Sequence, residues 1–293
     1  MKEKTILTLI ALLAGFVNVW ADDTPSGSWQ DSRYSISFTV DYDNTSTIYI
    51  NNAGQLAFLA AFVNSNRYDD NDNVIGYHDF EGKTIKINAN VSSLDLSDHY
   101  WDLPIGTAEH PFKGTFDFEG KTISGIINDP SESIGGLFGY IGEGGCVKGL
   151  KLENSHLCGK NYVGGIAAYN NGGTITDCVV EGDVTVSATA TGTTLGGIVG
   201  ANTGPSADKR GRISGCACSA AFIKAENQTL TIGGLAGDNG YSHIEYCLYL
   251  GTKQSLSGGY VMGDGPIGGT ADYTLNMSPI PTSLNNQNRA LLV

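Results

Sequence analysis

The motif that decides the fold reads Leu195-Gly196-Gly197-Ile198-Val199-Gly200, and it recurs along the second half of the chain. The other copies are Ile134-Gly135-Gly136-Leu137-Phe138-Gly139, Val163-Gly164-Gly165-Ile166-Ala167-Ala168, Ile232-Gly233-Gly234-Leu235-Ala236-Gly237 and a degenerate fifth that begins at Ile267-Gly268-Gly269. Successive copies start 29, 32, 37 and 35 residues apart. A constant motif at variable spacing predicts stacked structural repeats joined by loops of different length.

Each repeat carries a second element in the same order. Its copies are Ile175-Thr176-Asp177-Cys178, Ile213-Ser214-Gly215-Cys216, Ile244-Glu245-Tyr246-Cys247 and, with leucine in the cysteine position, Val147-Lys148-Gly149-Leu150. Apolar residues then alternate with a period of two, which indicates strands. A third apolar piece, such as Val184 to Val186, often follows. Three short strands per repeat, with no amphipathic helix between them, predict an all-β fold, a right-handed parallel β-helix.

Equivalent positions in such a fold stack on their own copies at about 4.8 Å. Ladders of equivalent residues follow from this spacing. The Gly-Gly pairs suit sharp corners with positive φ. The asparagines five residues after the second glycine suit left-handed corners and can hydrogen-bond to one another. Ile175 and Cys178 are three residues apart, so a bend must lie between them if both face inward. The predicted structural ladders comprise Cys178, Cys216 and Cys247, and Asn170, Asn202 and Asn239.

The tetrapeptides of the motif resemble the GLUG motif of bacterial secreted proteins. The copies that carry the resemblance are Gly136-Leu137-Phe138-Gly139, Gly197-Ile198-Val199-Gly200 and Gly234-Leu235-Ala236-Gly237. The segment upstream, from Asn52-Ala53-Gly54-Gln55-Leu56 onward, also resembles the leader of such arrays, and the resemblance covers about residues 45–275. That family recurs in adhesin-like surface proteins and in non-catalytic regions of proteins of the IgA-protease type. The resemblance implies a β-helix at the cell surface and names no ligand.

The same patterns divide the chain into five segments. Leu56, Leu59, Ala60 and Val63 fall at helical spacing, which predicts a helix over 54–64 that caps the open end of the solenoid. The segments are a signal peptide at 1–21, N-terminal strands at 22–53, the capping helix and first coils at 54–128, GLUG-type repeats at 129–275 and a C-terminal tail at 276–293.

The first residues have the pattern of a secretory signal peptide. Lys2 and Lys4 form a short positive region, Thr5 to Trp20 is apolar, and cleavage is expected after Ala21. The apolar run is short for a transmembrane anchor, and no second run of about 18 apolar residues follows it. We therefore expect a secreted, extracellular or cell-surface protein, with the periplasm as an alternative, and no transmembrane span after cleavage.

The composition excludes one class of partner. The chain of 293 residues has a net charge of −13, from 17 Lys and Arg against 30 Asp and Glu. Such a chain is a poor partner for nucleic acid, because it has few cations with which to neutralise phosphates. The sequence contains no cofactor-binding motif, and we expect no cofactor.

The six cysteines admit two interpretations. An even number in an exported chain is compatible with disulfides, which could use Cys146 or Cys158. Three of them, however, share a ladder position with Leu150, and a residue that alternates with leucine behaves as a small buried hydrophobe. Cys216 and Cys218 lack the spacing and the companion histidine of a zinc site, so no metal site is expected there.

One acidic stretch partly resembles a calcium loop. Asp70 and Asp72 lie in Tyr68-Asp69-Asp70-Asn71-Asp72-Asn73, but the glycine and the terminal glutamate of a calcium loop are missing. A solvated loop after the helix is the alternative interpretation.

Binding residues are easier to find than catalytic ones. Tyr140 and Tyr169 occupy equivalent positions and, if they face outward, form an aromatic strip for stacking on sugars. The alternative interpretation, which we favour from the sequence, is that they are corner aromatics that pack on each other. Arg210 and Arg212 form a basic spot on an acidic chain. No acidic column, shared histidine column or nucleophile motif is recognisable, so the sequence gives no support to catalysis.

These patterns favour a secreted or surface-exposed solenoid that acts as a non-catalytic binding or adhesion scaffold for glycans or for host or matrix proteins. Two alternatives stay open. One is a polysaccharide-degrading lyase or glycosidase on a β-helix frame. The other is a structural module of a larger envelope protein.

Overall fold

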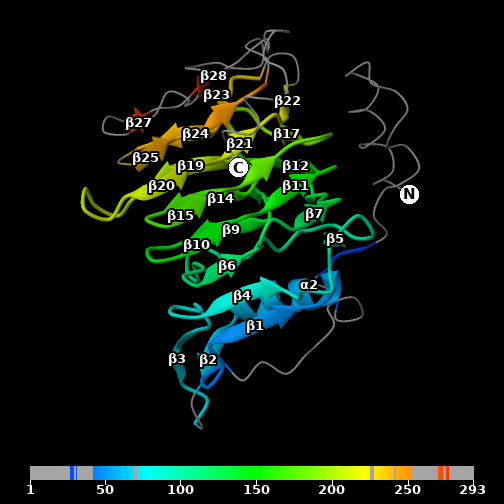
Figure 1. The fold of residues 1–293 in the computed structure, drawn as a ribbon, viewed down its shortest axis with the longest axis vertical. Coiled ribbons are helices and arrows are strands. Elements are labelled where there is room, and N and C mark those ends of the chain that lie inside the picture. Colours follow the sequence, from blue (N-terminus) through cyan, green and yellow to red (C-terminus); the bar gives the residue numbers. More distant parts are fainter. Residues whose placement is uncertain are drawn as a thin grey trace.

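The computed structural model describes residues 27–29, 31, 42–68, 71–224, 228–240, 242–251, 270–272 and 275–276. Within these residues the fold is all-β with one helix, as predicted. The strands form layers that stack along the long axis of the molecule (Figure 1).

Two long parallel sheets run along the stack. In spatial order, the eight-stranded sheet contains β1 (Thr47–Ile50), β4 (Thr84–Ile87), β6 (Thr115–Asp117), β10 (Cys146–Lys148), β15 (Thr174–Thr176), β20 (Gly211–Ser214), β25 (Ser242–Glu245) and β27 (Thr270–Asp272). The seven-stranded sheet contains β28 (Leu275–Asn276), β26 (Leu248–Tyr249), β21 (Ala217–Cys218), β16 (Val179–Val180), β11 (Lys151–Glu153), β7 (Thr122–Ser124) and β5 (Ser93–Asp95).

Three shorter parallel sheets and one hairpin complete the fold. The three-stranded sheet contains β12 (His156–Gly159), β17 (Thr185–Ala188) and β22 (Ala221–Ile223). One four-stranded sheet contains β23 (Thr231–Gly233), β18 (Thr194–Gly196), β13 (Tyr162–Gly164) and β8 (Ile134–Gly135). The other contains β24 (Ala236–Asn239), β19 (Val199–Thr203), β14 (Ala167–Asn171) and β9 (Phe138–Ile141). The antiparallel hairpin pairs β2 (Asn66–Tyr68) with β3 (Val74–Tyr77). Successive repeats add one strand to each parallel sheet, an arrangement consistent with a parallel β-helix.

A full repeat contains five short strands, β13 to β17, so the expectation of three is wrong. The Gly-Gly pair divides the first predicted strand into β13 and β14. A bend after Thr176 divides the second into β15 and β16. Periodicity does not show the division at the Gly-Gly pair, whereas the three-residue spacing of Ile175 and Cys178 predicts the bend that makes the second division.

The bend between Ile175 and Cys178 lies where the sequence requires one. Asp177 has a φ of 54°, in the left-handed region. The equivalent positions in the other repeats are Gly149 with a φ of 67°, Gly215 with 63° and Tyr246 with 53°. This single left-handed residue reverses the alternation, so that Ile175 and Cys178 are both fully buried although they are three residues apart.

In the first copy Gly136 has a φ of 150°, as predicted, but the next two Gly-Gly pairs require a different explanation. In the second and third copies neither glycine has a φ in the left-handed region. The constraint is space, because a Cβ on Gly197 would overlap the carbonyl oxygen of Gly234 in the next repeat and the sulfur of Cys218. A Cβ on Gly164 would lie 2.6 Å from the Cα of Val199. These glycines therefore allow neighbouring backbones to approach closely.

The core consists of apolar ladders. In the eight-stranded sheet the inward residues pair in register from strand to strand and are all buried: Ile85, Phe116, Val147, Ile175, Ile213 and Ile244. The ring of Phe116 stacks on that of Phe118 with centroids 4.1 Å apart. Strands that contribute one inward residue each thus bury a continuous apolar column.

The asparagines form a buried amide ladder. Nδ2 of Asn170 donates to Oδ1 of Asn202 at 2.8 Å, and Nδ2 of Asn202 donates to Oδ1 of Asn239 at 2.7 Å. All three lie within strands without a positive φ, so the expectation of left-handed corners is wrong. The ladder ends at Asn170, whose Oδ1 has no hydrogen-bond donor, because the repeat below has Ile141 in register.

The outer face of the eight-stranded sheet alternates charges. Lys86, Asp117 and Lys148 pair in register on adjacent strands. The Asp117 carboxylate lies 3.7 Å from Nζ of Lys86 and 3.1 Å from Nζ of Lys148. Opposite charges on neighbouring strands avoid the repulsion that a column of like charges would produce.

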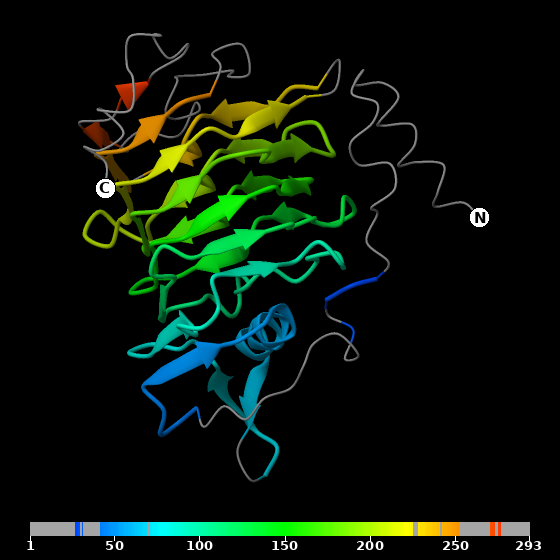
Figure 2. The same ribbon diagram turned by 45° about the vertical axis from the view of Figure 1, so that its right-hand side comes forward.

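The helix α2 (Ala53–Val63) lies beside β1 at the N-terminal end of the stack (Figure 2). Oδ1 of Asn52 accepts from the Gln55 amide, and Oε1 of Gln55 accepts from the Asn51 amide, both at 2.9 Å. This reciprocal capping fixes the start of the helix. The buried face of α2 consists of Gly54, Leu56, Ala57, Leu59, Ala60 and Val63.

Two glycine variants separate crowding from backbone conformation. Gly197→Ala should lower the free energy of unfolding by about 2–3 kcal/mol, because the new methyl group overpacks the space between repeats. Gly182→Ala should cost only about 1 kcal/mol, because Gly182 has a φ of 70° but a Cβ there would meet no atom closer than 3.8 Å. Urea denaturation followed by circular dichroism measures both values. Equal losses would contradict the role of crowding.

Loss of the middle asparagine should cost more than loss of an exposed asparagine on the adjacent strand. Asn202→Ala removes a donor and an acceptor at once, so the free energy of unfolding should fall by about 2–4 kcal/mol. Asn171→Ala, on the exposed outer face, should change it by less than about 0.5 kcal/mol. The same urea titration tests the pair, and a cost for Asn202→Ala as small as that of the control would show that the ladder contributes little.

Candidate functional site

Two stacked tyrosines lie on the outer face of the sheet that contains β9 and β14. Tyr140 and Tyr169 pair in register, and each is half-buried between inward-facing neighbours. Their rings are stacked with centroids 4.5 Å apart and an angle of 9° between the planes. Parallel stacking covers one face of each ring, so the pair leaves ring edges and hydroxyl groups for further contacts.

Tyr162 joins this pair from a different sheet. It lies on β13, on the other side of the Gly164-Gly165 corner, and its ring centroid is 4.4 Å from that of Tyr169. We name Tyr140, Tyr162 and Tyr169 the tyrosine cluster. Sequence analysis missed Tyr162 because its register partners, Ile134 and Thr194, are not aromatic, so its position shows no repeated signal.

Burial raises the pKa of both Tyr140 and Tyr169. The neighbouring phenols of Tyr162 and Tyr140 raise the pKa of Tyr169 further. These phenols are therefore neutral at physiological pH. The cluster offers aromatic ring edges together with hydroxyl groups, a combination that can pack against the apolar face of a sugar and hydrogen-bond to its hydroxyls.

The column of Tyr140 and Tyr169 continues to Ala201 and then Asp238. Burial raises the pKa of Asp238, and its Oδ1 has no hydrogen-bond partner. Among the described residues of this column, Asp238 is the single carboxylate. Glycoside hydrolysis requires two carboxyl groups that face each other across the substrate.

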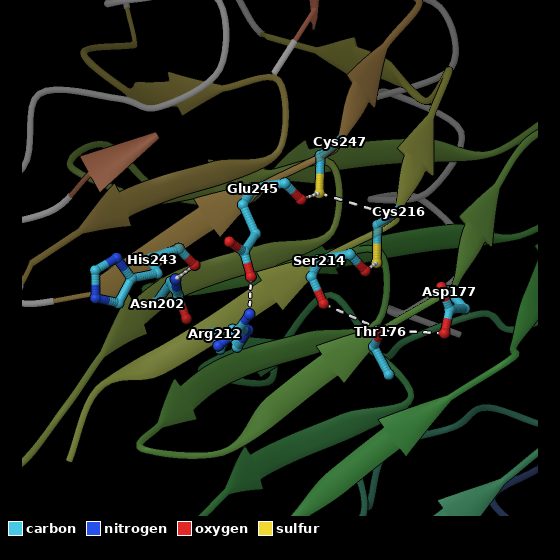
Figure 3. Close-up of polar contacts among 9 residues, drawn as sticks. All are labelled: Thr176, Asp177, Asn202, Arg212, Ser214, Cys216, His243, Glu245 and Cys247. Atoms are coloured by element: carbon cyan, nitrogen blue, oxygen red, sulfur yellow. Dashed lines mark hydrogen bonds and ion pairs between the residues drawn. The ribbon is translucent and has the colours of Figure 1, made fainter. Parts of the chain in front are cut away.

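The two predicted arginines are engaged differently, although they are two residues apart. Arg212 lies on β20 and forms an ion pair with Glu245 on β25 (Figure 3). Arg210 precedes the strand, and its Nη1 lies 3.2 Å from Nε2 of His243. Nε of Arg210 donates to the carbonyl oxygen of Ala207 at 2.6 Å. The structure thus places both arginines on one outer surface, but only one of them faces a carboxylate.

A short hydroxyl chain lies beside the Arg212 ion pair. The Ser214 hydroxyl donates to Oγ1 of Thr176 at 3.1 Å, and Oγ1 of Thr176 donates to Oδ2 of Asp177 at 3.1 Å (Figure 3). The chain contains no imidazole to act as a base for the serine, so it lacks the arrangement of an activated nucleophile.

All six cysteines are free thiols in this structure. Cys178, Cys216 and Cys247 are buried, with exposed fractions of 0%, 1% and 2%. Each thiol donates to the carbonyl oxygen two residues before it, at distances of 3.1, 3.3 and 3.1 Å. Burial raises the pKa of Cys216, and a hydrogen bond with Cys216 and then burial raise that of Cys247.

The calcium interpretation has little structural support. Asp70 lies outside the described residues, and Asp72 lies in the loop of the β2–β3 hairpin with a φ of 59°. The described part of the chain contains no group of three His, Cys, Asp or Glu side chains placed to hold a metal ion. Within the same residues, no helix is both long and apolar enough to cross a bilayer.

Comparison with known proteins supports the predicted resemblance. Residues 159–185 match the family model of the GLUG motif, which confirms the resemblance over this segment. The matched segment contains one Gly-Gly motif, the ladder residues Asn170 and Cys178, and two members of the tyrosine cluster.

One curated relative is Halomucin of Haloquadratum walsbyi (strain DSM 16790 / HBSQ001), which is 37% identical over 102 residues. The match covers 34% of this chain and 1% of Halomucin. A Bacteroides ovatus crystal structure, provisionally described as an immunoglobulin A1 protease, aligns with a TM-score of 0.45 and 17% identity. That alignment covers 79% of this chain and 75% of the other, and the likeness is too low to carry an argument.

Burial of the cysteines predicts how they react. Native protein treated with iodoacetamide at pH 8 should lose at most one thiol, the half-buried Cys146, whereas unfolded protein should lose all six. Buried thiols with a raised pKa form little thiolate, which is the reactive species. Intact mass spectrometry counts the alkylated groups. A native mass lower by two hydrogens for each pair of cysteines, in protein prepared without reductant, would instead show disulfides.

Proposed function

We propose that the chain is an exported, surface-exposed protein that acts as a non-catalytic binding scaffold, and that the tyrosine cluster is its contact site for glycans. The observation that carries this proposal is the pair of stacked rings of Tyr140 and Tyr169, which face outward in register with centroids 4.5 Å apart. Tyr162 widens the surface from the neighbouring sheet.

The scaffold in this proposal is a right-handed parallel β-helix with α2 as its N-terminal cap. The segment limits are those that the sequence predicts, with a signal peptide at 1–21 and GLUG-type repeats at 129–275. Parallel sheets that gain one strand per repeat support the solenoid. The reciprocal capping of α2 and its buried face support a helix that covers the end of the stack.

A location at the cell surface is supported by the GLUG match and by the similarity to Halomucin. Since the matched segment covers 1% of Halomucin, a repeat array of this type also occurs within a far longer protein. We therefore include in the proposal that the array works as a display module, whose ligand is a glycan rather than an extracellular protein.

A binding function fits the chemistry of the cluster better than catalysis does. Its tyrosines are neutral, and its column supplies one carboxylate, Asp238. An aromatic platform binds a sugar through its apolar face and needs no proton transfer.

The proposal predicts that the double variant Tyr140→Ala and Tyr169→Ala binds glycans about 10- to 100-fold more weakly than the wild type, since two aromatic contacts of about 0.7–1.4 kcal/mol each are removed. Binding is measured on an array of neutral oligosaccharides, followed by titration calorimetry with the best ligand. Tyr49→Ala is the matched control, because Tyr49 is 51% exposed but lies on β1, outside the cluster.

Two results would contradict this function. One is the absence of glycan binding by the wild-type protein. The other is the release of reducing or unsaturated sugars from polysaccharides, which would identify an enzyme instead.

A further inference from the structure

We propose that Arg210 binds the carboxylate of an acidic sugar, so that the protein distinguishes glycans that carry one terminal carboxylate from neutral ones. This inference rests on the proposed function only in taking a glycan as the ligand. It concerns a second surface, the outer face of β20 and β25, which the tyrosine cluster does not use.

Cations are concentrated at one place on this acidic chain. Lys209, Arg210 and Arg212 lie within four residues, in a protein with 17 Lys and Arg in all. Two of the three are neutralised by carboxylates, since Lys209 lies 2.8 Å from Glu143 and Arg212 pairs with Glu245. Arg210 differs, because no carboxylate of the described residues contacts its guanidinium.

The contacts of Arg210 are with neutral acceptors. Its Nε donates to the carbonyl oxygen of Ala207 at 2.6 Å, and its Nη1 lies 3.2 Å from Nε2 of His243. A guanidinium only donates, so Nε2 of His243 is the acceptor of this contact. The positive charge of Arg210 is therefore held in place but is not cancelled.

The loop that presents Arg210 is fixed to the sheet at several points. The ion pair with Glu143 ties Lys209 to a segment 66 residues earlier in the chain. Ser206 and Lys209 form an antiparallel bridge across the loop. A Cβ on Gly204 would lie 2.8 Å from the Cα of Arg210, so the two backbones are in close contact. A side chain held in this way loses little conformational entropy when it binds a ligand.

A held guanidinium with remaining N–H groups suits a carboxylate, which accepts two parallel hydrogen bonds from one arginine. The charge of the whole chain restricts the ligand further. At a net charge of −13, the protein repels polyanions at long range, whereas it repels a ligand with a single carboxylate much less. The favoured ligand is therefore an otherwise neutral oligosaccharide that ends in a sialic or uronic acid.

The experiment uses the full-length protein and an array of oligosaccharides in matched pairs, each ending in a sialic or uronic acid or in the methyl ester of the same acid. We expect at least tenfold tighter binding of the acids by the wild type. Arg210→Gln should remove this preference, whereas Arg212→Gln should retain it, because Arg212 is already paired with Glu245. Arg210→Lys keeps the charge without the planar fork and should retain only part of the preference. Thermal melting verifies that each variant is folded.

The outcomes separate this inference from the proposed function. Equal binding of acids and esters by the wild type would overturn the role of Arg210 while leaving glycan binding intact. Retention of the acid preference in Arg210→Gln would also overturn it. Equally tight binding of N-acetylglutamate would show an unspecific anion site. Binding of acids alone, with no effect of the tyrosine variants, would support Arg210 and contradict the tyrosine cluster.

Discussion

Each residue stacks on the equivalent residue of the next repeat, about 4.8 Å away, and the rest of the structure depends on this constraint. It selects residues whose side chains benefit from an identical neighbour. Isoleucine columns bury apolar surface, asparagine columns join their amides, and the Gly-Gly pairs let successive backbones approach. Charges follow the same constraint in a different way, because Lys86, Asp117 and Lys148 alternate in sign along one column.

Function in this fold depends on outward-facing positions whose residues differ from one repeat to the next. The inner columns must recur, but an outward residue can change from one repeat to the next at little cost to stability. Tyr140 and Tyr169 lie in a column that continues as Ala201 and Asp238, and Arg210 lies in a loop between β19 and β20. The frame thus holds variable side chains in fixed places, as a binding surface requires.

The sequence reveals the columns but not the contacts across corners. The spacing of the motifs predicts the register of Tyr140 with Tyr169 and the need for a bend near Asp177, because both follow from period and alternation. Tyr162 escapes prediction, since its contact with Tyr169 depends on how two sheets meet at Gly164 and Gly165. Positive φ is predicted for those glycines, yet crowding between backbones, which no single sequence displays, is the reason for them.

In-register stacking is tested most directly by a distance between spin labels along one outer column. Labels introduced as unnatural amino acids at Lys86 and Glu245 occupy strands β4 and β25, which are joined through Asp117, Lys148, Thr176 and Ser214 in register. Five steps at the strand spacing predict a narrow distribution of distances centred near about 24 Å in a double electron–electron resonance measurement. A broad distribution, or one centred beyond about 35 Å, would contradict the stacked arrangement, because seven or more strand spacings would then separate the labels.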